Sequence, residues 1–271
     1  MVPKNVRLVH GDIRRSSDVE EAVAGAETIF VLAGRSGASE SFRDPHEDLD
    51  INVGGLLTLL QTLVAKGVRS KIVFPGSRLE YGSVESIPVS EDVQLRPNSP
   101  YAMHKALCEE YLRLYHSRFG IRYAIARLTN PYGPVTTTAW RGYNVINHFI
   151  ARALASETIA LYGDGSQLRD YIYVDDAIEA LCCLADAPDP ALTLNVGSGV
   201  GISMAEAAHT IVRICGSGRV ASVDWPPEAR SIETGDFVAD IRKMREMGWE
   251  PKTSFEDGVR RTINAYQQSV A

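Results

Sequence analysis

The segment KIVFPGSRLEYG, residues 71–82, carries the pattern on which the fold prediction rests. Residues 71–77 are largely apolar and end at turn residues, as expected of a strand in an α/β sheet. Ser77 therefore stands at the carboxyl end of a strand, where open α/β sheets bind their ligands. Two interpretations of Ser77 are open: a hydrogen-bonding partner for a substrate hydroxyl, or a turn serine beside Gly76.

Strand-like and helix-like segments alternate on both sides of this strand. TIFVLAG, residues 28–34, is a nearly continuous apolar run, which indicates a parallel strand buried on both faces. The other elements expected in this half are a strand at 6–9, a helix at 16–26 capped by Ser16 or Ser17, helices at 50–66 and 100–120, the latter capped by Ser99, and a strand at 123–130. The alternation predicts a doubly wound parallel α/β sheet.

After residue 134 the alternation of strand-like and helix-like segments becomes less regular, which predicts a second, smaller α/β lobe. The elements expected there are helices at 145–155, 176–186 and 203–214 and strand-like segments at 159–163, 169–176 and 220–225. We therefore expect a first domain over residues 1–134, to which 169–196 return, and a smaller lobe over residues 135–271.

Composition excludes several classes of function. The formal net charge is −6 and the pI about 5.6, without a block of Lys or Arg, so nucleic acid and anionic membranes are poor partners. No apolar run approaches the ~20 residues of a membrane span, and no signal peptide is recognisable, which predicts a cytoplasmic protein. The cysteines and histidines form no metal-binding motif, so we expect no metal site and core thiols in a reducing compartment.

Tyr101 and Lys105 are four residues apart on the expected helix, so their side chains share one face. An ammonium beside a phenol lowers the pKa of the phenol and makes tyrosine usable as an acid or base near neutral pH. An ordinary surface tyrosine and lysine would show the same spacing. Asn52 near a helix start and Asn130 after a strand are either site residues or cap and turn residues.

Together, Ser77, Tyr101, Lys105 and Asn52 resemble the catalytic tetrad of the extended short-chain dehydrogenase/reductase family. The resemblance covers nearly the whole chain. The motifs in family order are GDI (11–13), VLAG (31–34), INVGG (51–55), SRLEYG (77–82), PYAMHK (100–105), RLTNPYGP (127–134), GDGSQLRDYIYVDD (163–176), NVGSG (195–199) and MGWEP (247–251). This resemblance implies a Rossmann-like NAD-binding sheet domain and a smaller lobe that binds a nucleoside-diphosphate sugar.

The resemblance also implies a role for each matching position. Tyr101 would be the general base, and Lys105 would hold the nicotinamide ribose. Ser77 would bind the reacting sugar hydroxyl, and Asn52 would support a proton-relay water. The other cofactor contacts would be Asp12 and Ile13 at the adenine, and Leu32, Ala33 and Gly34 beside the pyrophosphate and nicotinamide ribose. The other substrate contacts would be Asn130, Arg169 and Arg230 at the diphosphate and Glu233 at the ribose.

The diphosphate roles of Arg169 and Arg230 agree with physical chemistry, because the guanidinium group forms paired hydrogen bonds to phosphate oxygens. Arg169 could equally form a salt bridge with Asp170 or Asp175, and Arg230 could lie in a solvated loop. The resemblance also implies a homodimer formed through helices 54–66 and 101–118.

The residues after Ser77 bear on the reaction. The family's sugar 4,6-dehydratases resemble one another in an Asp-Glu pair at this point, and its uronate decarboxylases carry a Glu there. Here the residues are Arg78 and Leu79, and leucine cannot move protons. Glu80 on an extended segment would point to the other face. We therefore favour an epimerase, acting at C4 with tightly held NAD, over a reductase or dehydratase.

One family motif has no match before Val6. The family begins with a strand, G-x-x-G-x-x-G and a helix, which let the backbone approach the pyrophosphate. Gly197-x-Gly199-x-Gly201 imitates a dinucleotide motif, but its spacing is wrong and the stretch matches the substrate lobe. Three hypotheses follow: an N-terminally truncated epimerase, a nucleotide-sugar-binding or interaction module with impaired NAD binding, or a sheet completed by a partner or swapped segment.

Overall fold

The computed structural model describes residues 6–135 and 144–270, which belong to two compact units. Unit 1 consists of Met1–Gly82, Leu95–Ala126 and Leu184–Thr193, and unit 2 of Ser83–Gln94, Arg127–Cys183 and Leu194–Ala271. The expected division into lobes at 1–134 and 135–271 concerns ligand binding and stays a prediction. Among the described residues, no helix is long and apolar enough to cross a membrane.

The main sheet has the strand order β1-β2-β3-β7 and is built mostly from unit 1. Its strands are β1 (Thr28–Phe30), β2 (Lys71–Ser77), β3 (Arg122–Leu128) and β7 (Ala191–Val196). β1 and β2 are parallel, with Thr28 opposite Lys71. The predicted α/β class with a parallel sheet is confirmed, and β2 has the predicted bounds.

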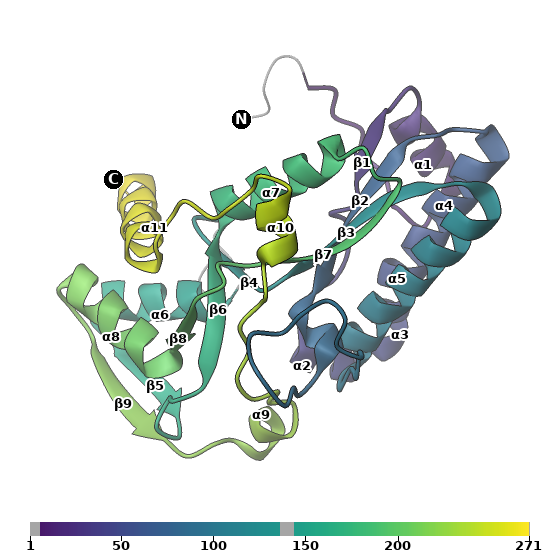
Figure 1. The fold of residues 1–271 in the computed structure, drawn as a ribbon. Helices are drawn as coiled ribbons and strands as arrows, with labels where there is room; N and C mark the ends of the chain where they lie inside the picture. The colour runs from purple at the N-terminus through teal and green to yellow at the C-terminus, as the bar shows by residue number, and fades with distance from the viewer. Residues whose placement is uncertain (1–5, 136–143, 271) are drawn as a thin grey trace. The chain divides into compact units, whose positions relative to one another are not determined.

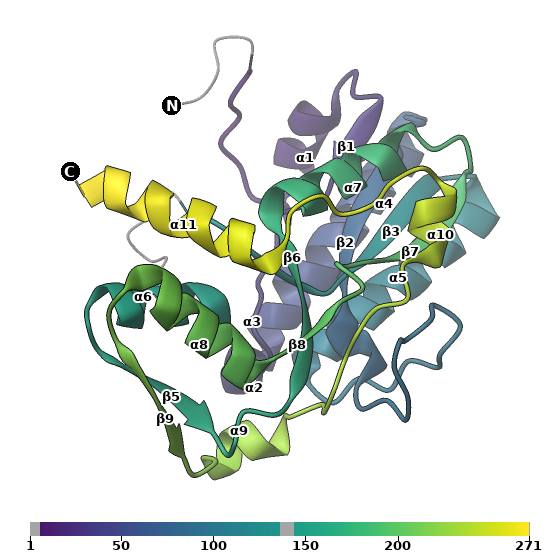
Figure 2. The same cartoon turned by 60° about the vertical axis from the view of Figure 1, so that its left-hand side comes forward.

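Helices α4 (Gly55–Lys66) and α5 (Pro100–Phe119) lie side by side along the sheet (Figures 1 and 2). Local signals set the ends of α5. Ser99 accepts a hydrogen bond from Ala102 N at 3.3 Å, and Pro100 occupies the first turn. Gly120 ends the helix in the left-handed conformation at φ 72°, which glycine adopts without strain.

Four expected elements of unit 1 differ in the structure. Residues 6–10 form no strand, because a strand needs a hydrogen-bonded neighbour and the described residues provide none there. The expected strand 28–34 ends at Phe30, and α1 (Ser16–Val23) begins after Arg15 without a side-chain cap. The expected helix 50–66 is divided into the π-helix η1 (Asp50–Gly54) and α4, and two short helices that were not expected, α2 (Ala38–Arg43) and α3 (Pro45–Leu49), precede it.

Unit 2 contains two small sheets. One has the order β4 (Asn130–Tyr132), β6 (Leu168–Tyr173) and β8 (Gly201–Ser203); the other pairs β5 (Thr158–Tyr162) with β9 (Arg219–Val223). The helices are α6 (Val145–Leu154), α7 (Val174–Asp186), α8 (Met204–Cys215), α9 (Pro227–Ser231), α10 (Arg242–Glu246) and α11 (Phe255–Val270). Apolar side chains of α6, α8 and α11 form one buried cluster with β5 and β6.

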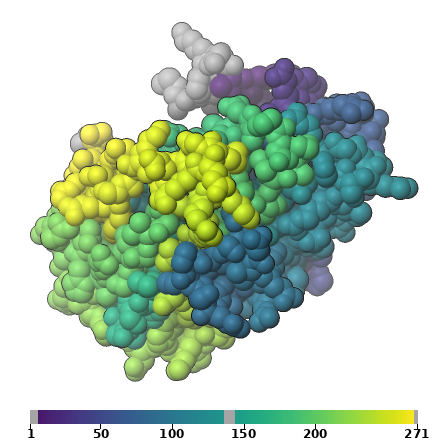
Figure 3. Space-filling view, in the orientation of Figure 1, coloured from purple at the N-terminus to yellow at the C-terminus, as the bar shows by residue number. Residues whose placement is uncertain are grey.

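A segment before α5 joins unit 2 through backbone pairing. Val89 N donates to Val238 O at 2.8 Å, and Asp240 N donates to Val89 O at 2.9 Å. Lys243 adds an ion pair to Glu91 at 3.2 Å. In the space-filling view, the yellow surface of α10 accordingly lies against blue surface of this segment (Figure 3). Residues 83–94 are therefore tied to residues 238–243, far along the chain.

Replacing Lys71 tests how much a buried cation stabilises unit 1. Its ammonium donates to the carbonyls of Leu184 at 2.6 Å and Ala187 at 2.7 Å, at the C-terminal end of α7. We expect Lys71→Met to lower the free energy of unfolding by about 2 kcal/mol, because two buried carbonyls lose a charged donor. Lys66→Met, which removes an exposed ion pair with Glu20, should cost no more than about 0.5 kcal/mol. Urea unfolding followed by circular dichroism measures both, and equal midpoints for the two variants would contradict the assignment.

Candidate active site

Tyr101 and Lys105 lie on the first turns of α5. Tyr101 N donates to Ser41 Oγ at 3.0 Å, which ties the start of α5 to α2. Lys105 Nζ donates to Pro75 O at 2.8 Å and lies 4.4 Å from the centre of the Phe74 ring and 6.0 Å from that of Tyr101. The ammonium is thus held at the carboxyl end of β2, near the Tyr101 ring.

Burial dominates the electrostatics of Lys105. Desolvation lowers the pKa of its ammonium, and the neighbouring Cys108, Glu80 and Asp48 oppose this shift. The thiol of Cys108 is itself buried, which raises its pKa to about 12. The carboxylates therefore favour the charged form of the lysine and oppose the larger effect of burial, which lowers its pKa.

Ser77 begins a 3₁₀ turn, η2 (Arg78–Tyr81), and the expectation of an extended segment there is wrong. Its Oγ accepts from Leu79 N at 3.2 Å, and its own N–H donates to Glu80 Oε1 at 2.5 Å. These reciprocal bonds form a capping box. Glu80 therefore turns back toward Ser77, completely buried, instead of pointing to the opposite face.

Asn52 lies in the π-helix η1 and holds the loop after β1. Its Oδ1 accepts from Arg35 N at 3.0 Å, and its Nδ2 donates to Arg35 O at 3.3 Å. A Cβ on Gly34 would lie 2.6 Å from that Oδ1, so only glycine allows this approach. π-Helical turns are frequent at functional sites. Because α5 packs against β2, η1 and η2, the elements that carry Ser77, Asn52, Tyr101 and Lys105 are neighbours in unit 1.

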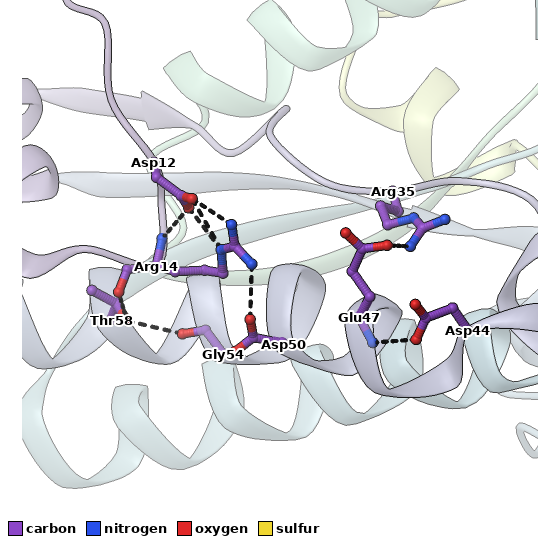
Figure 4. A network of polar contacts seen from close by, with 8 residues as sticks. All are labelled: Asp12, Arg14, Arg35, Asp44, Glu47, Asp50, Gly54 and Thr58. Atoms are coloured by element: carbon purple, nitrogen blue, oxygen red, sulfur yellow. Dashed lines mark hydrogen bonds and ion pairs between the residues drawn. The ribbon is translucent and has the colours of Figure 1, made fainter.

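The expected adenine contacts, Asp12 and Ile13, line an apolar hollow of about 190 Å³ between α1 and β1. Figure 4 shows Asp12 in a polar network with Arg14, which also reaches Asp50 at 2.9 Å. The hydrogen bonds and charge of Arg14 hold the pKa of the Asp12 carboxyl well below its usual range. This carboxylate is therefore ionised at neutral pH.

The remaining expected cofactor contacts, Leu32, Ala33 and Gly34, form an exposed stretch after β1. Leu32 is 66% exposed, although a large apolar side chain is usually buried. A separate group of contacts in Figure 4 contains Glu47, which forms an ion pair with Arg35 at the end of this stretch. The backbone after β1 is thus anchored at Arg35 while the residues before it stay accessible.

The expected substrate contacts of unit 2 divide into two groups. Arg169 is buried and forms an ion pair with Glu233, not with Asp170 or Asp175, and donates to Gly235 O at 2.7 Å. Asn130 Nδ2 donates to Asp170 O at 2.8 Å. Arg230 lies exposed on the short helix α9. Unit 2 therefore brings Arg169 and Glu233 into direct contact and leaves Arg230 facing solvent.

Sequence reasoning missed the role of Asp170. Its carboxylate accepts from Ser198 N at 2.7 Å, Gly199 N at 3.0 Å and Ala239 N at 3.1 Å. The glycine-rich stretch 197–201 thus wraps an internal carboxylate, and a Cβ on Gly197 would lie 2.6 Å from Asp170 Oδ2. This explains physically why that stretch imitates a phosphate-binding loop: backbone amides converge on an anion there. An aspartate within RDYIYVDD gives no signal of such distant partners.

No group of three His, Cys, Asp or Glu side chains placed to hold a metal ion occurs within residues 6–135 and 144–270.

Comparison with known proteins adds three findings. The sequence model of the "NAD dependent epimerase/dehydratase family" matches residues 2–197. A putative UDP-glucose 4-epimerase of Methanocaldococcus jannaschii is 32% identical over 260 residues, covering 95% of this chain and 83% of the relative, and a dTDP-glucose 4,6-dehydratase of Streptomyces griseus is 27% identical, covering 98% and 82%. The crystal structure of Thermus thermophilus UDP-glucose 4-epimerase with NAD superimposes with a TM-score of 0.88 at 30% identity, covering 98% of this chain and 86% of that one.

Replacing Asp170 tests the carboxylate that organises the 197–199 loop. Asp170→Asn places an amide N–H₂ against backbone N–H donors, so we expect a loss of about 3 kcal/mol in the free energy of unfolding. Asp175→Asn, at an exposed position five residues on, should change it by less than about 0.5 kcal/mol. Chemical denaturation of the two variants provides the comparison. A stable Asp170→Asn variant would show that the bonds contribute little.

Proposed function

The chain belongs to the NAD-dependent epimerase/dehydratase family, and we propose that within it the chain is a nucleotide-sugar 4-epimerase that acts on a UDP-sugar or related substrate. The observation that carries this choice is the turn after Ser77. Leu79 offers no proton-transferring group, and the carboxylate of Glu80 is completely buried and bonded to Ser77 N. A dehydratase needs an acid and a base beside the sugar, and this turn supplies neither.

The residues of unit 1 fit NAD. The hollow between α1 and β1 has apolar walls for a flat base and the ionised Asp12 at its rim. On α5, Lys105 and Tyr101 provide an ammonium and a phenol suited to the nicotinamide ribose. Held by these residues, NAD would supply a reversible hydride acceptor for the oxidation of the sugar carbon.

The side chains of the protein remove and return the proton of the reacting hydroxyl. The Tyr101 phenolate takes this proton and gives it back after the ketone has turned. Lys105 stabilises the phenolate by its positive charge. The Ser77 hydroxyl orients the reacting oxygen, and Asn52 supports a water that exchanges protons with Lys105. Since the hydroxyl is first oxidised and then reformed, no net oxidant is consumed.

The diphosphate and ribose of the substrate are assigned to unit 2. Arg230, exposed on α9, offers a guanidinium fork to the phosphate oxygens. Asn130 and Arg169 donate to the diphosphate, and Glu233 accepts from the ribose hydroxyls. UDP-glucose 4-epimerases among the relatives and solved structures favour a UDP-sugar over other sugar nucleotides. A cytoplasmic location is part of this proposal, since nucleotide sugars are charged metabolites.

Tyr101→Phe tests the base. We expect at least a 10³-fold loss of kcat for interconversion of UDP-glucose and UDP-galactose, because the phenylalanine cannot take the proton. Binding of UDP, measured by calorimetry, should stay within about twofold. Tyr115→Phe, on the same helix, should retain full turnover. Chromatographic separation of the two sugar nucleotides in the presence of NAD measures turnover; retained activity in Tyr101→Phe, or no NAD binding by the wild-type chain at millimolar NAD, would contradict the proposal.

A homodimer through helices 54–66 and 101–118 is also proposed. One face of α5 exposes three large apolar side chains, Met103, Leu107 and Leu114. Exposed apolar patches of this kind mark interaction surfaces. We expect sedimentation equilibrium to give twice the mass of one chain, and Met103→Glu with Leu114→Glu to give monomers. A monomeric wild-type chain at micromolar concentration would remove the dimer from the proposal.

A further inference from the structure

Asp48 and His104 form a buried pair of side chains between α3 and α5. His104 Nδ1 lies 2.6 Å from Asp48 Oδ1, and the two residues are 9% and 2% exposed. An ionised carboxylate only accepts hydrogen bonds, so Nδ1 of the imidazole is the nitrogen that donates. His104 directly precedes Lys105 in the sequence. The pair is therefore next to the candidate catalytic residues without being part of them.

The pair lies between two further polar contacts that tie α2 and η1 to α5. Near the start of α5, Ser41 Oγ accepts from Tyr101 N at 3.0 Å. Further along the helix, Cys108 Sγ donates to Asn52 O at 3.5 Å. Positions 101, 104 and 108 have the spacing of one helix face. Of these contacts, the bond of His104 is the one that joins two side chains, so substitution can remove it without touching the backbone.

The short helix α3 also holds the stretch after β1. Glu47, the neighbour of Asp48, forms an ion pair with Arg35 (Figure 4). Asp44 caps α3 by accepting from Glu47 N at 2.9 Å. Asn52, in the following π-helix, accepts from Arg35 N at 3.0 Å. One turn of helix thus reaches the expected cofactor stretch through Glu47 and the helix of the expected base through Asp48.

Helices as short as these need tertiary contacts to hold them. α2, α3 and η1 contain six, five and five residues, and isolated helices shorter than about 12 residues are marginal in water. Apolar packing would stabilise them at least as well, since replacing a buried charged pair by apolar side chains is often neutral or stabilising. Apolar contacts are non-directional, however, whereas a hydrogen-bonded pair fixes one register. Register therefore explains the pair better than stability does.

We propose that Asp48 and His104 are positioning residues, whose hydrogen bond sets the register of η1 against α5 and so keeps Asn52 aligned with Lys105. This inference rests on the proposed function, in which Asn52 supports a water that exchanges protons with Lys105. Neither Asp48 nor His104 touches a reacting atom. A displacement of about 1 Å between η1 and α5 would misplace the proton relay and lower kcat.

A double substitution separates register from stability. In Asp48→Ala with His104→Met, apolar side chains of similar total volume replace the pair, so the midpoint of urea unfolding should stay close to that of the wild type. We expect kcat to fall about 30-fold and KM for the UDP-sugar to stay within about twofold. Lys71→Met, which lowers stability at the other end of β2, is the control and should keep its kcat. A wild-type kcat in the double variant would overturn the inference.

His104→Asn and His104→Gln form a matched pair of single variants. The amide nitrogen of asparagine takes the place of Nδ1 and can donate to Asp48, whereas that of glutamine takes the place of Nε2. We expect His104→Asn to keep kcat within about threefold of the wild type and His104→Gln to lose about 30-fold. Equal kcat values in the two variants would overturn the role of the bond. These variants carry the test if the double variant does not fold.

Hydrogen exchange provides a readout that does not depend on turnover. The amides of Arg35 and Tyr101 are bonded to Asn52 Oδ1 and Ser41 Oγ, on the segment that the pair would hold. We expect both amides to exchange about tenfold faster in the double variant, because the segment opens more easily once its register is free. NMR of the full-length chain without NAD or substrate measures this rate. Unchanged exchange would show that the pair does not position the segment.

The outcomes distinguish this inference from the proposed function. Faster exchange in the double variant, together with a wild-type chain that does not interconvert UDP-sugars, would refute the epimerase and retain the pair as the contact that sets the register. An active wild-type chain, with unchanged exchange and unchanged kcat in the double variant, would overturn the inference and keep the epimerase.

Discussion

The buried ammonium of Lys105 is the constraint around which the carboxyl end of β2 is arranged. An ammonium removed from water needs hydrogen-bond acceptors and negative charge from the protein. Here the Pro75 carbonyl at 2.8 Å, the face of Phe74 and nearby carboxylates meet that need. The same contacts fix α5 against β2, so the helix that carries Tyr101 and the strand that carries Ser77 are held by one side chain.

The elements predicted correctly from sequence are those with local causes. α5 begins and ends where Ser99, Pro100 and Gly120 indicate, because capping bonds and a left-handed glycine are decided within a few residues. The strand expected at 6–9 failed because strand formation depends on a distant neighbour. The break of the expected helix 50–66 at the π-helix η1 has a similar origin: Asn52 bonds to Arg35 in the loop after β1, a contact that periodicity alone does not contain.

The site shows the same division between local and distant causes. Tyr101 and Lys105 could be paired from helical spacing. An ion pair of Arg169 was only an alternative to its expected role at the diphosphate, and the partners considered, Asp170 and Asp175, were wrong. Glu233 and the donors that surround Asp170 come from segments far along the chain, which a single sequence does not bring together. The Ser-x-x-Glu pattern at residues 77–80 was a visible capping-box signal, and applying it would have predicted the turn.

That turn matters for the choice of reaction. On an extended segment, Glu80 would stand one residue after the position at which the dehydratases carry their Glu. A small shift of the loop could then bring its carboxylate to the sugar. In the 3₁₀ turn, its carboxylate is committed to Ser77 N and enclosed by protein, so exposing it would break the bonds that position Ser77. The fold is shared by epimerases and dehydratases, and a fold alone does not determine chemistry. The distinction lies in whether the carboxylate after the serine faces the sugar or supports the serine, and in this chain it supports the serine.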